Sequence, residues 1–108
     1  MRKLDLSTYE WNLTKPDGSK EKVKYDVRDN ITGVLLHPNQ KMNGVGLLKH
    51  HKIASMINDC EEDTILLEDS DYFVIKAAFE TIEGFGLPDV ELVERVLNAP
   101  VVPKVKEG

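Results

Sequence analysis

The sequence predicts an α+β fold in which an N-terminal β-hairpin packs against about four α-helices. Two patterns lead to this prediction. Short runs within residues 3–27 alternate between apolar and polar side chains, which is typical of half-buried strands. From residue 31 onward, apolar residues recur at three- and four-residue steps, which is typical of amphipathic helices. The length of 108 residues favours one domain, expected to span residues 1–103 and to precede a flexible tail at 104–108.

The hairpin is predicted from two alternating runs on either side of a turn. Residues 16–18 read Pro-Asp-Gly, which favours a chain reversal. The apolar rows expected to face each other are Tyr9, Trp11 and Leu13, and Val23, Tyr25 and Val27. We expect these rows to rest on helices, because a two-stranded hairpin is not stable alone. A separate alternating run at residues 3–6 precedes the hairpin, with a bend at residues 7–8.

The strongest helical pattern lies in residues 72–82. The one-face positions are Tyr72, Ile75, Ala78, Phe79 and Ile82, with Phe73 and Ala77 expected to widen the apolar stripe. The apolar run before this helix predicts a short third strand at residues 64–67. This helix is therefore the expected centre of the core.

Three further helices are predicted around it. The first begins after a cap at Asp29 or Asn30 and ends near His37, because Pro38 disfavours helix in the preceding residue. The second spans about residues 43–58, and its apolar positions are Leu47, Leu48, Ile53, Ala54, Met56 and Ile57. The last spans about residues 88–98, and residues 99–103 follow it in an extended conformation.

The net charge of −5 conceals an uneven distribution along the chain. Residues 59–95 contain twelve Asp and Glu against Lys76 and Arg95, whereas residues 1–28 carry a balance of +2. A negative surface on the C-terminal half argues against binding of a nucleic-acid backbone. It permits a basic protein partner, imitation of a nucleic acid, or a face that is simply solvated.

The sequence favours a cytoplasmic protein. It contains no run of 18 apolar residues, and its N-terminus lacks the apolar region of a signal peptide. Cys60 is the only cysteine, which excludes an internal disulfide and fits a reducing compartment. We therefore expect no membrane association.

No strong catalytic or metal motif is present, so we assign no catalytic, cofactor or metal residue. His50, His51 and Cys60 are the only combination that suggests such chemistry. Adjacent histidines point about 100° apart on a helix, which does not make a two-ligand clamp. Acidic residues flank Cys60, so its surroundings lack the positive charge that is typical of a reactive cysteine.

The acidic stretch at residues 59–71 has some likeness to a calcium loop, but an apolar run interrupts it and it has no glycine. Acids at residues 68–71 are better explained as the N-terminus of the following helix. If the negative surface binds a partner, the candidate residues are Glu61, Glu62, Asp69 and Asp71.

The chain resembles small uncharacterised proteins of tailed bacteriophages and prophages. The resemblance rests on Lys-Leu-x-Leu-Ser-Thr at residues 3–8, Leu-Leu-x-Pro at 35–38, a helical pattern at 49–57 and Leu-x-x-x-Asp at 67–71. It implies a phage or prophage origin and a non-enzymatic role in the bacterial cytoplasm or in association with the virion. It supplies no catalytic residues.

Three functions follow as hypotheses. The first is a protein–protein interaction module, such as an assembly or accessory factor, and a homo-oligomer is compatible with it. The second is an acidic inhibitor of a host nucleic-acid-binding or defence system. The third is a small metal-binding protein or enzyme that uses His50, His51 and Cys60.

Overall fold

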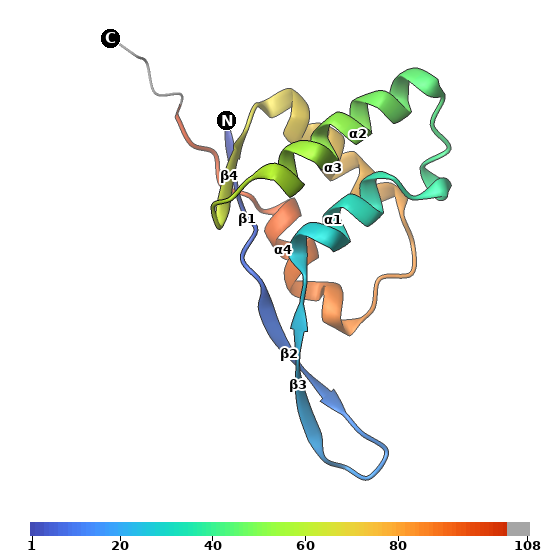
Figure 1. Ribbon diagram of the computed structural model, residues 1–108, viewed down its shortest axis with the longest axis vertical. Coiled ribbons are helices and arrows are strands. Elements are labelled where there is room, and N and C mark those ends of the chain that lie inside the picture. The colour runs from blue at the N-terminus through green and yellow to red at the C-terminus, as the bar shows by residue number, and fades with distance from the viewer. Residues whose placement is uncertain (104–108) are drawn as a thin grey trace.

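A computed structural model of the protein describes residues 1–103 and confirms the α+β prediction (Figure 1). The strands are β1 (Arg2–Asp5), β2 (Tyr9–Thr14), β3 (Lys20–Tyr25) and β4 (Thr64–Leu67). The α-helices are α1 (Val27–Leu35), α2 (Gly44–Asp59), α3 (Asp69–Thr81) and α4 (Val90–Leu97), with 3-10 turns η1 (Pro38–Gln40) and η2 (Leu87–Asp89). The flexible tail predicted at 104–108 lies outside the described residues.

The strands form two separate antiparallel pairs. The hairpin β2–β3 runs from the pair Tyr9 and Tyr25 at its base to Thr14 and Lys20 at its tip. The predicted strand at residues 64–67 is present, but β4 pairs with β1 and does not extend the hairpin. The bend at residues 7–8 separates β1 from β2, so the two pairs can take different directions.

The end of the described chain returns to the N-terminus. Val101 bridges Arg2, and the Lys3 N–H donates to the Pro100 carbonyl at 3.0 Å. Residues 99–102 are thus extended, as predicted, and they lie beside β1.

Two details of the predicted hairpin are wrong. Val27 was expected in the second strand, but it is the first residue of α1. In addition, Leu13 faces Glu21 across the hairpin, and not one of the apolar residues predicted for the second strand. Val27 is helical because the side chain of Asp26 accepts a hydrogen bond from the Asp29 N–H at 3.0 Å and caps α1. The predicted cap at Asp29 or Asn30 is therefore three or four residues too late.

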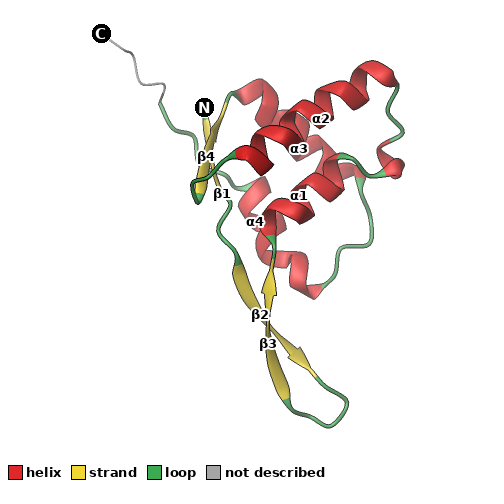
Figure 2. Ribbon diagram, in the orientation of Figure 1, coloured by secondary structure: helices red, strands yellow, loops and turns green. Residues whose placement is uncertain are grey.

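The expectation that the hairpin rests on helices holds only at its base. Tyr25 is buried there, and its ring stacks on Tyr9 with 4.6 Å between centroids. Trp11 is half-buried and packs against the core, whereas Leu13 farther out is exposed. Figure 2 shows the outer half of the hairpin extending away from the helices. The hairpin therefore projects, and only its first residue pairs are anchored.

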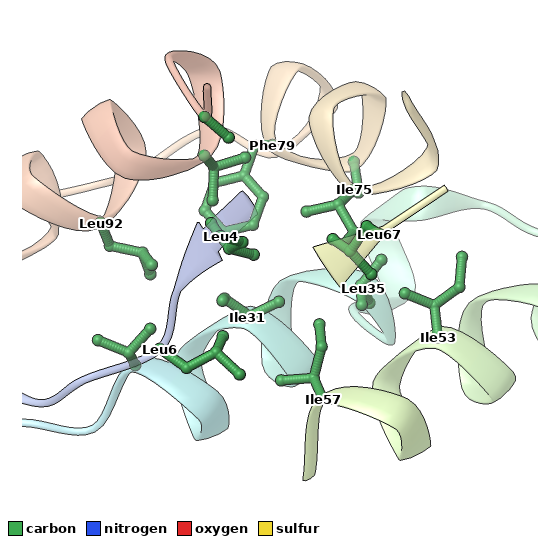
Figure 3. Close-up of a cluster of buried hydrophobic side chains, with 14 of the residues drawn as sticks. Leu4, Leu6, Ile31, Leu35, Ile53, Ile57, Leu67, Ile75, Phe79 and Leu92 are labelled. Carbon is green, nitrogen blue, oxygen red and sulfur yellow. The ribbon is translucent and has the colours of Figure 1, made fainter. Parts of the chain in front are cut away.

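The core gathers buried side chains from β1, α1, α2, β4, α3 and α4 (Figure 3). Of the residues predicted for α3, Tyr72, Ile75, Ala78 and Phe79 are buried, as expected. Ile82 follows the helix and is half-buried. Phe73 and Ala77 are exposed, so they do not widen the buried stripe. Burial of this apolar area is the main stabilising contribution to the fold.

The boundaries predicted for α2 are correct within one residue. Asn43 is the cap, and its side-chain oxygen accepts a hydrogen bond from the Gly46 N–H at 2.8 Å. Of the predicted apolar positions, Ile53, Ala54 and Ile57 are buried in the core as expected, whereas Leu47 and Leu48 are exposed. The first turns of α2 therefore present apolar side chains to solvent.

Replacement of Asn43 by alanine is expected to lower the free energy of unfolding by about 1 kcal/mol, because α2 loses its N-terminal cap. Asn58 lies exposed in the last turn of the same helix, so Asn58→Ala is a matched control. Urea unfolding should show a change within about 0.5 kcal/mol for the control. Equal effects of the two substitutions would contradict the capping role.

Candidate functional site

The four acidic residues proposed as a partner-binding surface lie in two separate pairs. Glu61 and Glu62 are exposed in the loop between α2 and β4. Asp69 and Asp71 belong to the first turn of α3, beyond the other end of β4. Asp69 forms an ion pair with the N-terminal amino group at 3.4 Å. The structure therefore does not bring the four side chains together into one cluster.

The histidines and the cysteine are also separated. The Nδ1 of His50 lies 2.8 Å from the Leu35 carbonyl oxygen, so this ring joins α2 to α1. His51 is exposed, and Cys60 caps the end of α2 roughly 15 Å of helical rise beyond His50. Within residues 1–103, no group of three or more His, Cys, Asp or Glu side chains is arranged to hold a metal ion.

A groove between the hairpin and the start of α4 is the better candidate for a binding site. Its volume is about 400 Å³, and residues 9–12 of β2 form one wall. The other wall includes Leu87, Val90, Glu91 and Glu94. We call this site the hairpin groove. A neighbouring hollow beside Phe85 shares Leu87, Val90 and Glu94, so the apolar surface continues past the groove.

The groove exposes large apolar side chains to solvent. Leu87 is 78% exposed and Val90 is 49% exposed. They stand three residues apart, and Trp11 lines the opposite wall. A cluster of exposed apolar side chains of this kind is characteristic of a surface that binds another molecule.

Acidic side chains flank these apolar residues. Glu10 lies on the β2 wall, and Glu91 and Glu94 lie on α4. Glu91 is paired with Arg95 at 2.7 Å, and Glu10 stands opposite Lys24 in the hairpin. The salt bridges of residues 1–103 do not include Glu94. The groove thus offers negative charge next to apolar surface.

Arg95 supports the groove from behind. Its side chain is only 17% exposed, and it donates to the Ser7 carbonyl at 2.6 Å. Its guanidinium carbon also lies 5.0 Å from the centre of the Tyr9 ring. The positive charge of Arg95 is therefore shared between contacts within the fold and Glu91, and Glu94 supplies the remaining negative charge on this wall of the groove.

Two tyrosines fix the hairpin to η2. The Tyr9 hydroxyl donates to the Pro88 carbonyl at 2.5 Å, and the Tyr25 hydroxyl donates to the Asp89 carboxylate. The other oxygen of Asp89 accepts a hydrogen bond from the Gly86 N–H at 2.8 Å. Burial, together with the hydrogen bond and the charge of Asp89, raises the pKa of Tyr25 above its ordinary value. These hydrogen bonds fix the position of the hairpin wall of the groove relative to the wall formed by η2 and α4.

The raised pKa of Tyr25 predicts a loss of stability at alkaline pH. Below about pH 10, this tyrosine is protonated in both the folded and the unfolded states, and its contribution is fully present. Above that pH the unfolded state loses the proton first, which favours unfolding. The free energy of unfolding would be measured by urea unfolding at several alkaline pH values. We expect it to decrease less steeply with rising pH in Tyr25→Phe than in the unchanged protein. Equal slopes would contradict the hydrogen bond between Tyr25 and Asp89.

The sequence interpretation missed the hairpin groove. It selected acidic residues because they are dense along the chain. Leu87 and Val90 form a groove only because the hairpin lies opposite them in the fold. The pattern of α4 offered no signal of this groove. Its apolar residues gather on one side, as in an ordinary amphipathic helix, although only Leu92 and Val96 are fully buried.

Searches against protein-family models, curated proteins and solved structures find no significant match for the chain.

Proposed function

We propose that this protein acts by binding another protein, and that the hairpin groove receives a basic, apolar segment of that partner. The observation that carries the proposal is the exposure of Leu87 and Val90 in a groove flanked by Glu10, Glu91 and Glu94. Apolar contact at the centre of an interface supplies most of the affinity. The surrounding carboxylates select a partner that carries Lys or Arg.

The charge of the chain supports the same choice of partner. Residues 59–95 carry a balance of −10, and α4 belongs to this segment. A field of this sign raises the rate at which a basic partner arrives and disfavours acidic partners. It also disfavours direct contact with a nucleic-acid backbone.

The proposed setting is a phage or prophage protein in the bacterial cytoplasm that serves as an assembly or accessory factor. The sequence resemblance motivates this setting, and a non-enzymatic binding role is compatible with it. Among residues 1–103, no helix is long and apolar enough to span a membrane.

The other two hypotheses receive less support from the geometry. Imitation of nucleic-acid phosphates by Glu61, Glu62, Asp69 and Asp71 would use a continuous acidic surface, and β4 separates the two pairs. Chemistry that combines His50 with Cys60 would need the two side chains to meet, but His50 lies within α2 and Cys60 caps the end of that helix ten positions later.

The groove can be tested with its own fluorophore. Trp11 is the only tryptophan of the chain, and it lines the groove. Two synthetic amphipathic peptides would have identical apolar residues. One would carry Lys at every polar position and the other would carry Glu. We expect the Lys peptide to change the Trp11 emission in a saturable, salt-sensitive manner and the Glu peptide to leave it unchanged. Equal binding of both peptides, or of neither, would contradict the proposal.

A further inference from the structure

The exposed face of α2 is a second surface with unpartnered apolar side chains. Val45 is 79% exposed and Leu48 is 71% exposed. They are three residues apart and therefore neighbours on the helix surface. Lys49 and Lys52 are exposed beside them, while Ile53, Ala54 and Ile57 are the residues of this helix that are buried in the core.

This surface has the opposite charge to the hairpin groove. Residues 30–58 contain no Asp or Glu, and they include Lys41, Lys49 and Lys52. The exposed face of α2 is thus both apolar and basic. These are the two properties that the groove requires of its occupant.

We propose that α2 of one copy docks into the hairpin groove of a second copy, so that the protein self-associates head to tail. This inference rests on the function proposed above and names the partner as the chain itself. Val45 and Leu48 of one copy would cover Leu87 and Val90 of the next.

The spacing of the charges fits the same contact. Lys49 and Lys52 are three residues apart on α2, and Glu91 and Glu94 are three residues apart on α4. Each pair therefore presents two charges about one helical turn apart. Two helices that meet along these faces can bring one lysine to Glu94 and the other to Glu91, which also pairs with Arg95, while the apolar pairs meet beside them.

The two surfaces occupy different parts of the molecule. Figure 1 shows that α2 begins at the end of the helical body farthest from the hairpin. A contact that joins two different surfaces leaves one groove and one α2 face free after each addition. Copies joined in this manner form a closed ring or an open chain.

Sedimentation velocity of the full chain tests the inference with two variants. Leu87→Asp blocks the groove, and Leu48→Asp blocks the α2 face. Both positions are largely exposed, so each variant should fold, which circular dichroism would verify. The unchanged protein is expected to gain mass with concentration and to lose it with added salt. Each variant alone is expected to remain a monomer.

The mixture of the two variants gives the sharpest outcome. One variant retains the groove and the other retains the α2 face, so an equal mixture should form dimers and nothing larger. An unchanged protein that stays monomeric at every concentration would overturn the inference. Self-association that either variant retains in full would also overturn it, because the contact would then lie elsewhere.

The inference and the proposed function can fail separately. Binding of the Lys peptide at Trp11 by a chain that stays monomeric would overturn self-association and leave the groove as a site for a different basic partner. Absence of both self-association and peptide binding would overturn both.

Discussion

Replacement of Tyr72 by alanine is expected to lower the free energy of unfolding by roughly 3–5 kcal/mol, the usual cost of removing a large buried ring. Tyr72 is 1% exposed and lies near the start of α3. A domain of this size has a total stability of about 5–15 kcal/mol, so this single change would consume a large share of it.

Several parts of the chain meet at Tyr72, which is why the effect should be large. Its hydroxyl donates to the Val96 carbonyl at 2.7 Å, joining α3 to the end of α4. The guanidinium of Arg2 lies 4.7 Å from the centre of its ring. Alanine would leave a cavity and an unpaired carbonyl, and both are destabilising.

The neighbouring ring provides the control. Phe73 is 50% exposed, although the sequence pattern placed it at the edge of the buried stripe. Phe73→Ala should cost less than about 1 kcal/mol in urea unfolding of the two variants. If the two substitutions destabilised the protein equally, the orientation of α3 described here would be wrong.

Replacement of Leu87 by aspartate is expected to weaken binding of a basic apolar partner at least about tenfold, with little change in stability. The side chain is 78% exposed in the free protein, so folding does not depend on it. In the complex an aspartate would place a carboxylate in the apolar centre of the interface, where burial of the charge is unfavourable.

Val101→Asp is the matched control for this binding prediction. Val101 is 68% exposed and lies beside β1, outside the lining of the groove. Titration of the Lys peptide against Trp11 fluorescence should give the control the affinity of the unchanged protein. An equal loss of peptide affinity in both variants would indicate non-specific hydrophobic binding and would contradict a defined site in the groove.

Local signals in the sequence were sufficient for much of the fold. Asn43 marks the start of α2 because its short polar side chain caps a helix well. The spacing of Tyr72, Ile75 and Phe79 identifies the buried face of α3, since only one side of that helix can meet the core. These features depend on residues close together in the chain.

The errors arose where distant residues decide the outcome. Leu48 fits an apolar stripe by spacing, yet no element of the fold covers it within the described residues. Val27 continues the alternation of the second strand, but Asp26 begins a helix there. The hairpin groove exists because Trp11 and Leu87 face each other across 76 positions of sequence. No local pattern contains that relation.

Site-specific photo-cross-linking in cells that express the protein is the most direct test of the groove as the working surface. A photoreactive residue would replace Asn12, which lines the groove, and Val101 would serve as the control position. We expect Asn12 to cross-link to a segment rich in Lys or Arg and apolar residues, and Glu94→Lys to abolish that product. A product of equal yield at Val101, or an acidic segment captured at Asn12, would contradict the proposed function.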